Sequence, residues 1–164
     1  MALVVENGSG LTFAESYASV AEADAYFAAY GNETWSTHPE DVKEIALRKS
    51  TRDLDLMYGA VWNWPSLVDG QSLLFPRFAA QGVPNALKRA TMELAAMIAD
   101  GYEPFVIDPE NEISEKTVKV DVIETSVKYS SSRRASPELE RIRLILGSLV
   151  PTTISAGYAR VVRG

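Results

Sequence analysis

The chain has 164 residues, of which 46% are hydrophobic and 23% charged, and its formal net charge is −6. This composition is typical of one globular domain with a sizeable core, and it excludes a largely disordered chain. The absence of cysteine excludes disulfides and thiolate metal sites and gives no sign of an oxidising compartment. No stretch approaches the roughly 20 apolar residues of a membrane span, and the basic head of a signal peptide is missing, so we expect a protein that is cytosolic when made and has no membrane contact.

Charge is distributed unevenly along the chain. Before Lys43 there is no Lys or Arg, and all charged residues are acids, namely Glu6, Glu15, Glu22, Asp24, Glu33, Glu40 and Asp41. After Glu140 there is no acid, and the charged residues are Arg141, Arg143, Arg160 and Arg163. The net negative charge opposes the wrapping of a polyanion unless the few basic residues gather in one place.

Two helices are predicted in the N-terminal third. Ser19 and Glu22 form a capping box, and apolar residues at helical spacing then lead to Gly31, a typical C-terminal cap. Thr37 and Glu40 form a second capping box, which predicts a helix that runs to about residue 58. The residues expected on its inner face are Val42, Ile45, Ala46, Leu54 and Met57.

Two further helices are predicted on either side of an acidic segment. The third opens at Pro84 and ends before Gly101, and the fourth opens at Ser136 and Pro137 and ends before Pro151. Their inward positions are Leu87, Ala90, Leu94, Met97, Ile98, Leu139, Ile142, Ile145, Leu146 and Leu149. We expect Leu94 and Ile145 to be fully buried.

Between these two helices the hydrophobic period changes to two, over about residues 116–130. The alternation starts at Val118 and slips by one residue near Ile123 and Glu124, which predicts a bulge or a tight hairpin there. The sequence therefore predicts a mainly α fold, with one helical domain over residues 1–150, a β-hairpin or β-arm before the last helix, and an extended tail over residues 151–164.

The segment from Gly59 to Gly82 has no period and many turn residues, so a long ordered loop is predicted. Its possible contact residues are Trp62, Trp64, Phe75 and Arg77. These side chains suit a stacking platform for single-stranded nucleic acid. The preferred interpretation is an apolar lid on the helical core, because Arg77 is the one basic residue between Arg52 and Lys88 and phosphate binding normally recruits several.

Residues with catalytic or ligand-binding chemistry are few. His38 is the only histidine, and its place beside Pro39 predicts an exposed position in the first turn of a helix. The glycine-containing segment 6–12 has no Lys-Ser or Lys-Thr after it, so a phosphate loop is not expected. The acidic residues of 108–115 lack the spacing of a calcium loop. We therefore expect no enzyme, no metal and no cofactor.

Four segments, "GLTFAESYASVAEADAYFAAYG", "ALRKSTRDLDLMYG", "QSLLFPR" and "VPNALKRATMELA", together resemble a family of tailed-phage and prophage proteins. These are head-tail connectors, also called adaptors or head completion proteins, and relatives are often labelled DnaT-like single-stranded DNA-binding proteins. The resemblance implies a small four-helix bundle that carries a β-arm. It also implies a ring, usually of twelve copies, in the virion beneath the portal.

The resemblance implies a structural role in which the protein joins the portal protein to a tail-side connector or tail terminator. Genomic DNA would pass through the ring without specific binding, and the acid-rich N-terminal third suits a channel wall that repels phosphates. The alternative is a single-stranded DNA-binding accessory protein of phage replication. A hydrolase is the third and least favoured hypothesis, because the catalytic residues are so few.

The C-terminal tail lies beyond Pro151 and has no helical period. We predict that it adds as a strand to a partner's sheet and docks on the portal. Its expected contact residues are Tyr158, Arg160, Val161, Val162 and Arg163. The alternative is that it packs on the protein's own β-arm as an ordinary terminal strand.

Overall fold

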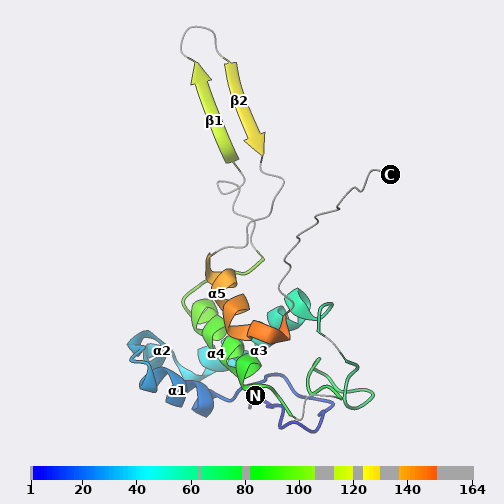
Figure 1. The fold of residues 1–164 in the computed structure, drawn as a ribbon. Coiled ribbons are helices and arrows are strands. Elements are labelled where there is room, and N and C mark those ends of the chain that lie inside the picture. Colours follow the sequence, from blue (N-terminus) through cyan, green and yellow to red (C-terminus); the bar gives the residue numbers. More distant parts are fainter. Residues whose placement is uncertain are drawn as a thin grey trace, which may run out of the picture.

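The structure is a computed structural model that describes residues 2–62, 64–78, 82–105, 113–119, 124–129 and 137–150. Its helices are α1 (Val20–Ala29), α2 (Glu33–Thr37), α3 (Glu40–Tyr58), α4 (Asn85–Ala99) and α5 (Pro137–Leu146), and a 3-10 turn, Gly147–Leu149, follows α5. Figure 1 shows their order along the chain. The predicted mainly α class is confirmed, with one helix more than the four expected.

The start of α1 agrees with its predicted capping box. The Ser19 hydroxyl accepts a hydrogen bond from the backbone N–H of Glu22, and the Glu22 carboxylate accepts one from the backbone N–H of Ser19. Both partners thereby satisfy N–H groups that have no acceptor inside the helix. Gly31 follows the C-cap with φ of +70°, a conformation that favours glycine.

The predicted capping box of Thr37 and Glu40 is wrong. The structure has a separate short helix, α2, whose N-cap Asn32 accepts a hydrogen bond from the backbone N–H of Trp35. Thr37 ends α2, and Pro39 is the N-cap of α3 without a side-chain cap. The local reason is that Asn32 and the buried Trp35 stabilise one additional helical turn before Pro39.

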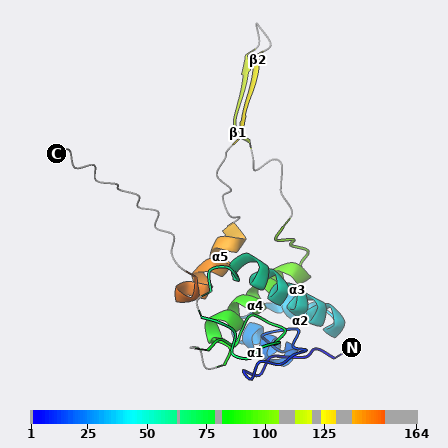
Figure 2. The ribbon, with the colours of Figure 1, turned by 90° about the vertical axis from the view of Figure 1, so that its right-hand side faces the viewer.

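Helix α4 is central to the fold, between α3 and α5 (Figures 1 and 2). One side of α4 contributes Leu87, Ala90 and Leu94 to a core that also contains Leu54 of α3 and Ile142 of α5. Another side contributes residues to a second core with α1, α2 and α3, namely Met92, Ala95 and Ala96. Helix α4 therefore contributes buried apolar residues to both cores of the described part of the chain.

The predicted core positions are confirmed in part. Leu94 is fully buried, as expected. Ile145 is only half-buried, so the prediction of full burial is wrong for this residue, and the reason is a surface groove that it lines. Ile45 is 50% exposed, because the face of α3 that packs in the core carries the next residue, Ala46, and not Ile45.

Two strands, β1 (Ile113–Lys119) and β2 (Glu124–Tyr129), pair antiparallel. Lys119 pairs with Glu124, and the register is irregular between Ile113 and Glu115. The connection at 120–123, where the turn or bulge was expected, lies outside the described residues, as does the tail at 151–164. The hairpin and the four-helix bundle arrangement stay predictions.

None of the helices in the described part of the chain is both long enough and apolar enough to cross a lipid bilayer.

Candidate nucleic-acid interface

The four loop residues singled out in the sequence lie together, but three of them are in the interior. Trp62, Phe75 and Arg77 are buried, and the rings of Trp62 and Phe75 meet edge to face at 4.9 Å. The Arg77 guanidinium lies 5.8 Å from the centroid of the Trp62 ring and 5.6 Å from that of Phe75. It donates hydrogen bonds to the backbone carbonyls of Trp62 and Trp64. These three side chains therefore stabilise the loop and offer no free face to a base.

A second set of contacts holds the loop to the helical core through Asp55 of α3. The hydroxyl of Tyr17 donates a hydrogen bond to Asp55 Oδ1 at 2.6 Å and accepts one from the backbone N–H of Phe75 at 3.2 Å. The backbone N–H of Leu74 donates to Asp55 Oδ2 at 3.1 Å. Burial raises the pKa of the Asp55 carboxyl to about 6, although these hydrogen bonds oppose the shift.

Trp64 differs from its loop neighbours because it is 64% exposed. Its φ of +73° lies in the left-handed region that residues other than glycine seldom adopt. Other apolar side chains of the same loop are exposed as well, and we call the set the loop patch: Trp64, Leu67, Val68 and Phe78. Asp69 is the charged residue beside it in the sequence. The loop patch suits contact with an apolar protein surface better than contact with a polyanion.

The glycine-containing segment 6–12 forms a loop around a carboxylate, and this carboxylate is the side chain of Glu6 in the same segment. The buried Glu6 carboxylate accepts hydrogen bonds from the backbone N–H groups of Gly8, Gly10 and Leu11, at 2.8, 3.0 and 2.8 Å. Three N–H groups converge there as they do around a bound phosphate. Since Glu6 occupies them, this loop offers no phosphate site.

His38 is half-buried rather than exposed as predicted. Its Nε2 lies 2.9 Å from Asp100 Oδ1, so it connects the C-terminus of α2 to the end of α4. The side chains of the acidic segment 108–115 lie outside the described residues. In the part of the chain that the structure describes, no group of three or more His, Cys, Asp or Glu side chains could hold a metal ion.

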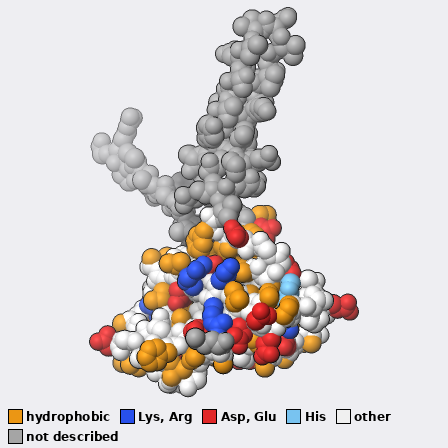
Figure 3. Space-filling view, turned by 180° about the vertical axis from the view of Figure 1, so that it is seen from behind, with side chains coloured by type: hydrophobic (Ala, Val, Ile, Leu, Met, Phe, Trp, Pro, Cys, Tyr) orange, Lys and Arg blue, Asp and Glu red, His pale blue; other side chains and the backbone are white. Residues whose placement is uncertain are grey.

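Most of the basic residues of α3 contact acids. Arg48 contacts Glu15 at 3.0 Å and Glu44 at 3.2 Å, and Arg52 contacts the buried Asp53 at 2.9 Å. Figure 3 shows Lys and Arg side chains on the rear face with Asp and Glu side chains among them. This mixture gives little net attraction for a phosphate backbone.

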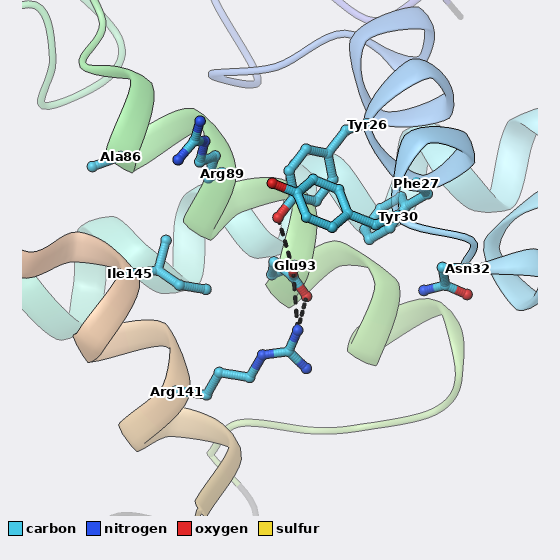
Figure 4. Close-up of a pocket in the computed structure, with 9 residues that line it drawn as sticks. All are labelled: Tyr26, Phe27, Tyr30, Asn32, Ala86, Arg89, Glu93, Arg141 and Ile145. Carbon is cyan, nitrogen blue, oxygen red and sulfur yellow. Dashed lines mark hydrogen bonds and ion pairs between the residues drawn. The ribbon is translucent and has the colours of Figure 1, made fainter.

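A groove between α1, α4 and α5 has a different character. Its volume is about 560 Å³, and it is lined by Tyr26, Phe27, Tyr30, Asn32, Ala86, Arg89, Glu93, Arg141 and Ile145. The lining residues that come from one helix stand mostly three or four positions apart in the sequence, so they lie on one face of that helix. Figure 4 shows the side chains from the three helices around the groove. The small Ala86 leaves room beside Arg89 on α4.

Charges in the groove are arranged around Glu93. The Tyr26 hydroxyl donates a hydrogen bond to Glu93 Oε1 at 2.9 Å, and Arg141 Nη2 lies 3.1 Å from Oε2 (Figure 4). Burial and the neighbouring Glu93 raise the pKa of Tyr26 to about 12, so its hydroxyl remains a donor at neutral pH. The Arg89 guanidinium has no hydrogen-bond or ion-pair partner among the described residues. It is therefore available to an anionic ligand.

The aromatic wall of the groove is partly open to solvent. The rings of Tyr26 and Tyr30 lie 4.7 Å apart, and Tyr30 is 70% exposed. An exposed tyrosine ring offers a planar surface for stacking. Sequence reasoning missed this groove, although Tyr26 and Tyr30, and likewise Arg89 and Glu93, stand four residues apart on the helices that it predicted.

Fold and groove together define a small helical protein whose surface offers aromatic rings and arginine side chains in one groove. The chain belongs to the family described as "Putative DnaT-like ssDNA binding protein", whose family model matches residues 1–164. Neither the search of curated proteins nor the search of solved structures returns a match. The family description agrees with the alternative function from the sequence, and no comparison supports the head-tail connector, which was the first hypothesis.

Proposed function

We propose that the protein is a single-stranded DNA-binding accessory protein, and that the groove between α1, α4 and α5 is its binding site. The observation that carries this proposal is Arg89, which has no ion-pair partner among the described residues, beside the exposed Tyr30 in one groove. Family membership supports it independently. The site replaces the loop residues as the candidate interface, since Trp62, Phe75 and Arg77 are buried.

The groove has the two kinds of contact that single strands require. Proteins that bind single strands without sequence preference combine positive charge along the backbone with aromatic rings on which bases stack. Arg89 provides the charge and Tyr30 provides the ring. Since the whole chain carries a net charge of −6, binding depends on this local arrangement and is expected to be weak and salt-sensitive.

The test is fluorescence anisotropy of a labelled oligothymidine at several salt concentrations. We expect binding that weakens as salt rises, with poor competition by a duplex because its bases are already stacked. Arg89→Ala should weaken binding and reduce the magnitude of the log–log salt slope by about 0.7, the value for one lost phosphate contact on a single strand. Tyr30→Ala should weaken binding by about 1–3 kcal/mol, the usual contribution of one stacked base.

Arg143→Ala is the matched control for Arg89→Ala. Arg143 lies on α5 and contacts Glu140 at 3.1 Å, and it does not line the groove. The Arg143→Ala substitution removes the same charge from the protein as Arg89→Ala does, so a general electrostatic effect would weaken binding equally in both variants. Equal loss in both, or an affinity that Arg89→Ala leaves unchanged, would contradict the proposed site.

A second candidate function, the structural connector, is favoured by the loop patch. An exposed apolar surface on a loop held by buried hydrogen bonds is typical of a surface that meets another protein. In this proposal the protein forms a ring in the virion, contacts the portal protein and a tail-side connector or terminator, and is not an enzyme. The tail residues, among them Tyr158, Arg160 and Val162, would dock on the portal.

Deletion of residues 155–164 tests the connector proposal. The truncated protein should keep its melting temperature and no longer bind capsids that carry a portal. Phe78→Ser, in the loop patch, should weaken the same binding without affecting oligonucleotide affinity. Capsid binding that survives both changes would exclude this use of the tail and the patch.

A further inference from the structure

We infer that Glu93 competes with the strand inside the groove: its carboxylate occupies Arg141 and leaves Arg89 as the one arginine that contributes a full phosphate contact. This inference rests on the proposed function and specifies what limits the affinity of the same site. It comes from the contacts that direct Glu93 to Arg141 and not to Arg89.

The two arginines of the groove have different surroundings. Arg141, on α5, places Nη2 3.2 Å from Oε1 and 3.1 Å from Oε2 of Glu93, so one nitrogen contacts both carboxylate oxygens. Arg89 lies on α4, four residues before Glu93, and has no ion-pair partner among the described residues. The spacing would allow Glu93 to pair with Arg89 on the same helix, but the carboxylate pairs with α5 instead.

Tyr26 holds the Glu93 carboxylate in this position. Its hydroxyl, on α1, donates to Glu93 Oε1 at 2.9 Å (Figure 4). The Glu93 side chain is 13% exposed, whereas that of Arg141 is 62% exposed. The acid is therefore fixed between two neighbouring helices, while the guanidinium that it contacts remains open to solvent and to a ligand.

A phosphate that reaches Arg141 meets the Glu93 carboxylate as well. Arginine has several N–H donors, so Arg141 can donate to a phosphate oxygen while it contacts Glu93. The carboxylate offsets the attraction of that contact, because two anions on one guanidinium repel each other. Displacement of Glu93 would instead leave a mostly buried carboxylate without its cation, which is unfavourable. By either route Arg141 adds little to the affinity of the wild-type protein for a strand.

The charges of the lining give the same result. Arg89 and Arg141 are cationic and Glu93 is anionic, so the charged side chains of the lining leave a single net positive charge. Glu93→Gln raises this charge by one and keeps an acceptor oxygen for Tyr26. A more positive groove attracts every phosphate more strongly. The inference therefore predicts tighter binding in Glu93→Gln, whereas the loss of a purely structural contact would give no such gain.

The experiment measures the affinity of a short labelled oligothymidine by fluorescence anisotropy at several salt concentrations. In the wild type the log–log salt slope should have a magnitude of about 0.7, the value for one phosphate contact on a single strand. Glu93→Gln should bind about three- to tenfold more tightly at low salt and raise the magnitude to about 1.4, because Arg141 then provides a second contact. Glu93→Gln combined with Arg141→Ala, whose lining has the net charge of the wild type, should restore the wild-type slope.

Glu140→Gln is the matched control. Glu140 lies on α5 outside the groove lining and contacts Arg143 at 3.1 Å, so this substitution removes the same charge and releases an arginine elsewhere on the same helix. It should leave the affinity and the salt slope almost unchanged. Melting temperatures establish that each variant is folded.

A wild-type slope of about 1.4 would mean that both arginines already contact phosphates, and it would overturn the inference without any variant. Equal gains in Glu93→Gln and Glu140→Gln, or no gain in Glu93→Gln, would overturn it as well. In each of these cases, oligonucleotide binding that depends on Arg89 leaves the proposed function standing. Absence of oligonucleotide binding by the wild-type protein overturns both.

Discussion

The hydroxyl of Tyr17 lies 2.6 Å from a carboxylate oxygen of Asp55, and this hydrogen bond joins the segment before α1 to the middle of the chain. Asp55 also accepts from Leu74, so one carboxyl group holds the N-terminal segment, α3 and the long loop together. Burial raises the pKa of Tyr17 as well, so its hydroxyl remains a donor over the usual pH range.

The first prediction is a pH dependence of stability that originates at Asp55. Its pKa is about 6 in the folded protein, above the usual 3.8, so the folded state binds the proton more tightly than the unfolded state. The stabilisation is therefore fully present below about pH 4 and is lost as pH rises through 6. Asp55→Asn cannot ionise, so it should remove this slope and add a constant cost from the changed contact with Leu74.

Melting temperatures of the two proteins between pH 4.5 and 7.5 provide the measurement. Other carboxyls, such as that of Glu15, have lowered pKa values and contribute stability that is lost as pH falls, so the difference between the variant and the wild type is the informative quantity. The melting temperature of Asp55→Asn should rise relative to that of the wild type as pH increases. Parallel profiles would show that Asp55 titrates normally.

The second prediction compares two apolar residues that the sequence alone placed in the same core. Leu94→Ala removes a fully buried side chain and should lower the free energy of unfolding by about 2–5 kcal/mol. Ile145→Ala, at the half-buried edge of the groove, should cost clearly less. Urea unfolding measures both. A loss below about 0.5 kcal/mol at Leu94 would be incompatible with its position between α3 and α5.

The third prediction separates the two tryptophans of the loop. Trp62→Ala removes a ring that is 6% exposed and should cost about 3–5 kcal/mol. Trp64→Ala should cost little, because the ring is 64% exposed. Trp64→Gly should be more stable than Trp64→Ala, since glycine adopts the observed φ of +73° without strain. Thermal unfolding of the three variants checks the order, and a large loss in Trp64→Ala would mean that its ring is anchored.

The fourth prediction concerns the buried carboxylate near the N-terminus. Glu6→Gln replaces one acceptor oxygen with a donor that faces the backbone N–H groups of the loop. It should destabilise the protein by about 1–3 kcal/mol, the cost of leaving buried donors unsatisfied. Glu33→Gln, at an exposed position of α2, is the control and should change the melting temperature little. Equal stability of the two variants would contradict the role of Glu6.

Much of the helical structure follows from local signals. The capping box at Ser19 and the prolines at 84 and 137 mark helix starts because they act through neighbouring backbone groups alone. Helix α2 was missed because a five-residue helix is too short to show a period, and its stability depends on the burial of Trp35. Burial at the edge of a face, as at Ile45, depends on which neighbours pack there.

The groove could not be predicted in the same way. Tyr30, Arg89 and Arg141 are far apart in the sequence, and each is an ordinary outward-facing residue of its own helix. Their common site depends on α4 packing between its neighbours, a relationship that helical periodicity does not contain. The loop residues suggested a binding site because aromatic and basic residues were close in the sequence, but burial determines whether such residues can be reached.

The composition of the groove links ligand binding to the folding of the whole helical unit. Its walls come from three helices, so the unfolded chain has no equivalent site, and a ligand of the groove binds the folded state alone. Such a ligand raises the free energy of unfolding by about 2.7 kcal/mol at a free concentration of 100 times its Kd. Thermal shift is therefore a direct reporter of the site, and a strand that binds the groove will protect α1, α4 and α5 together from amide hydrogen exchange.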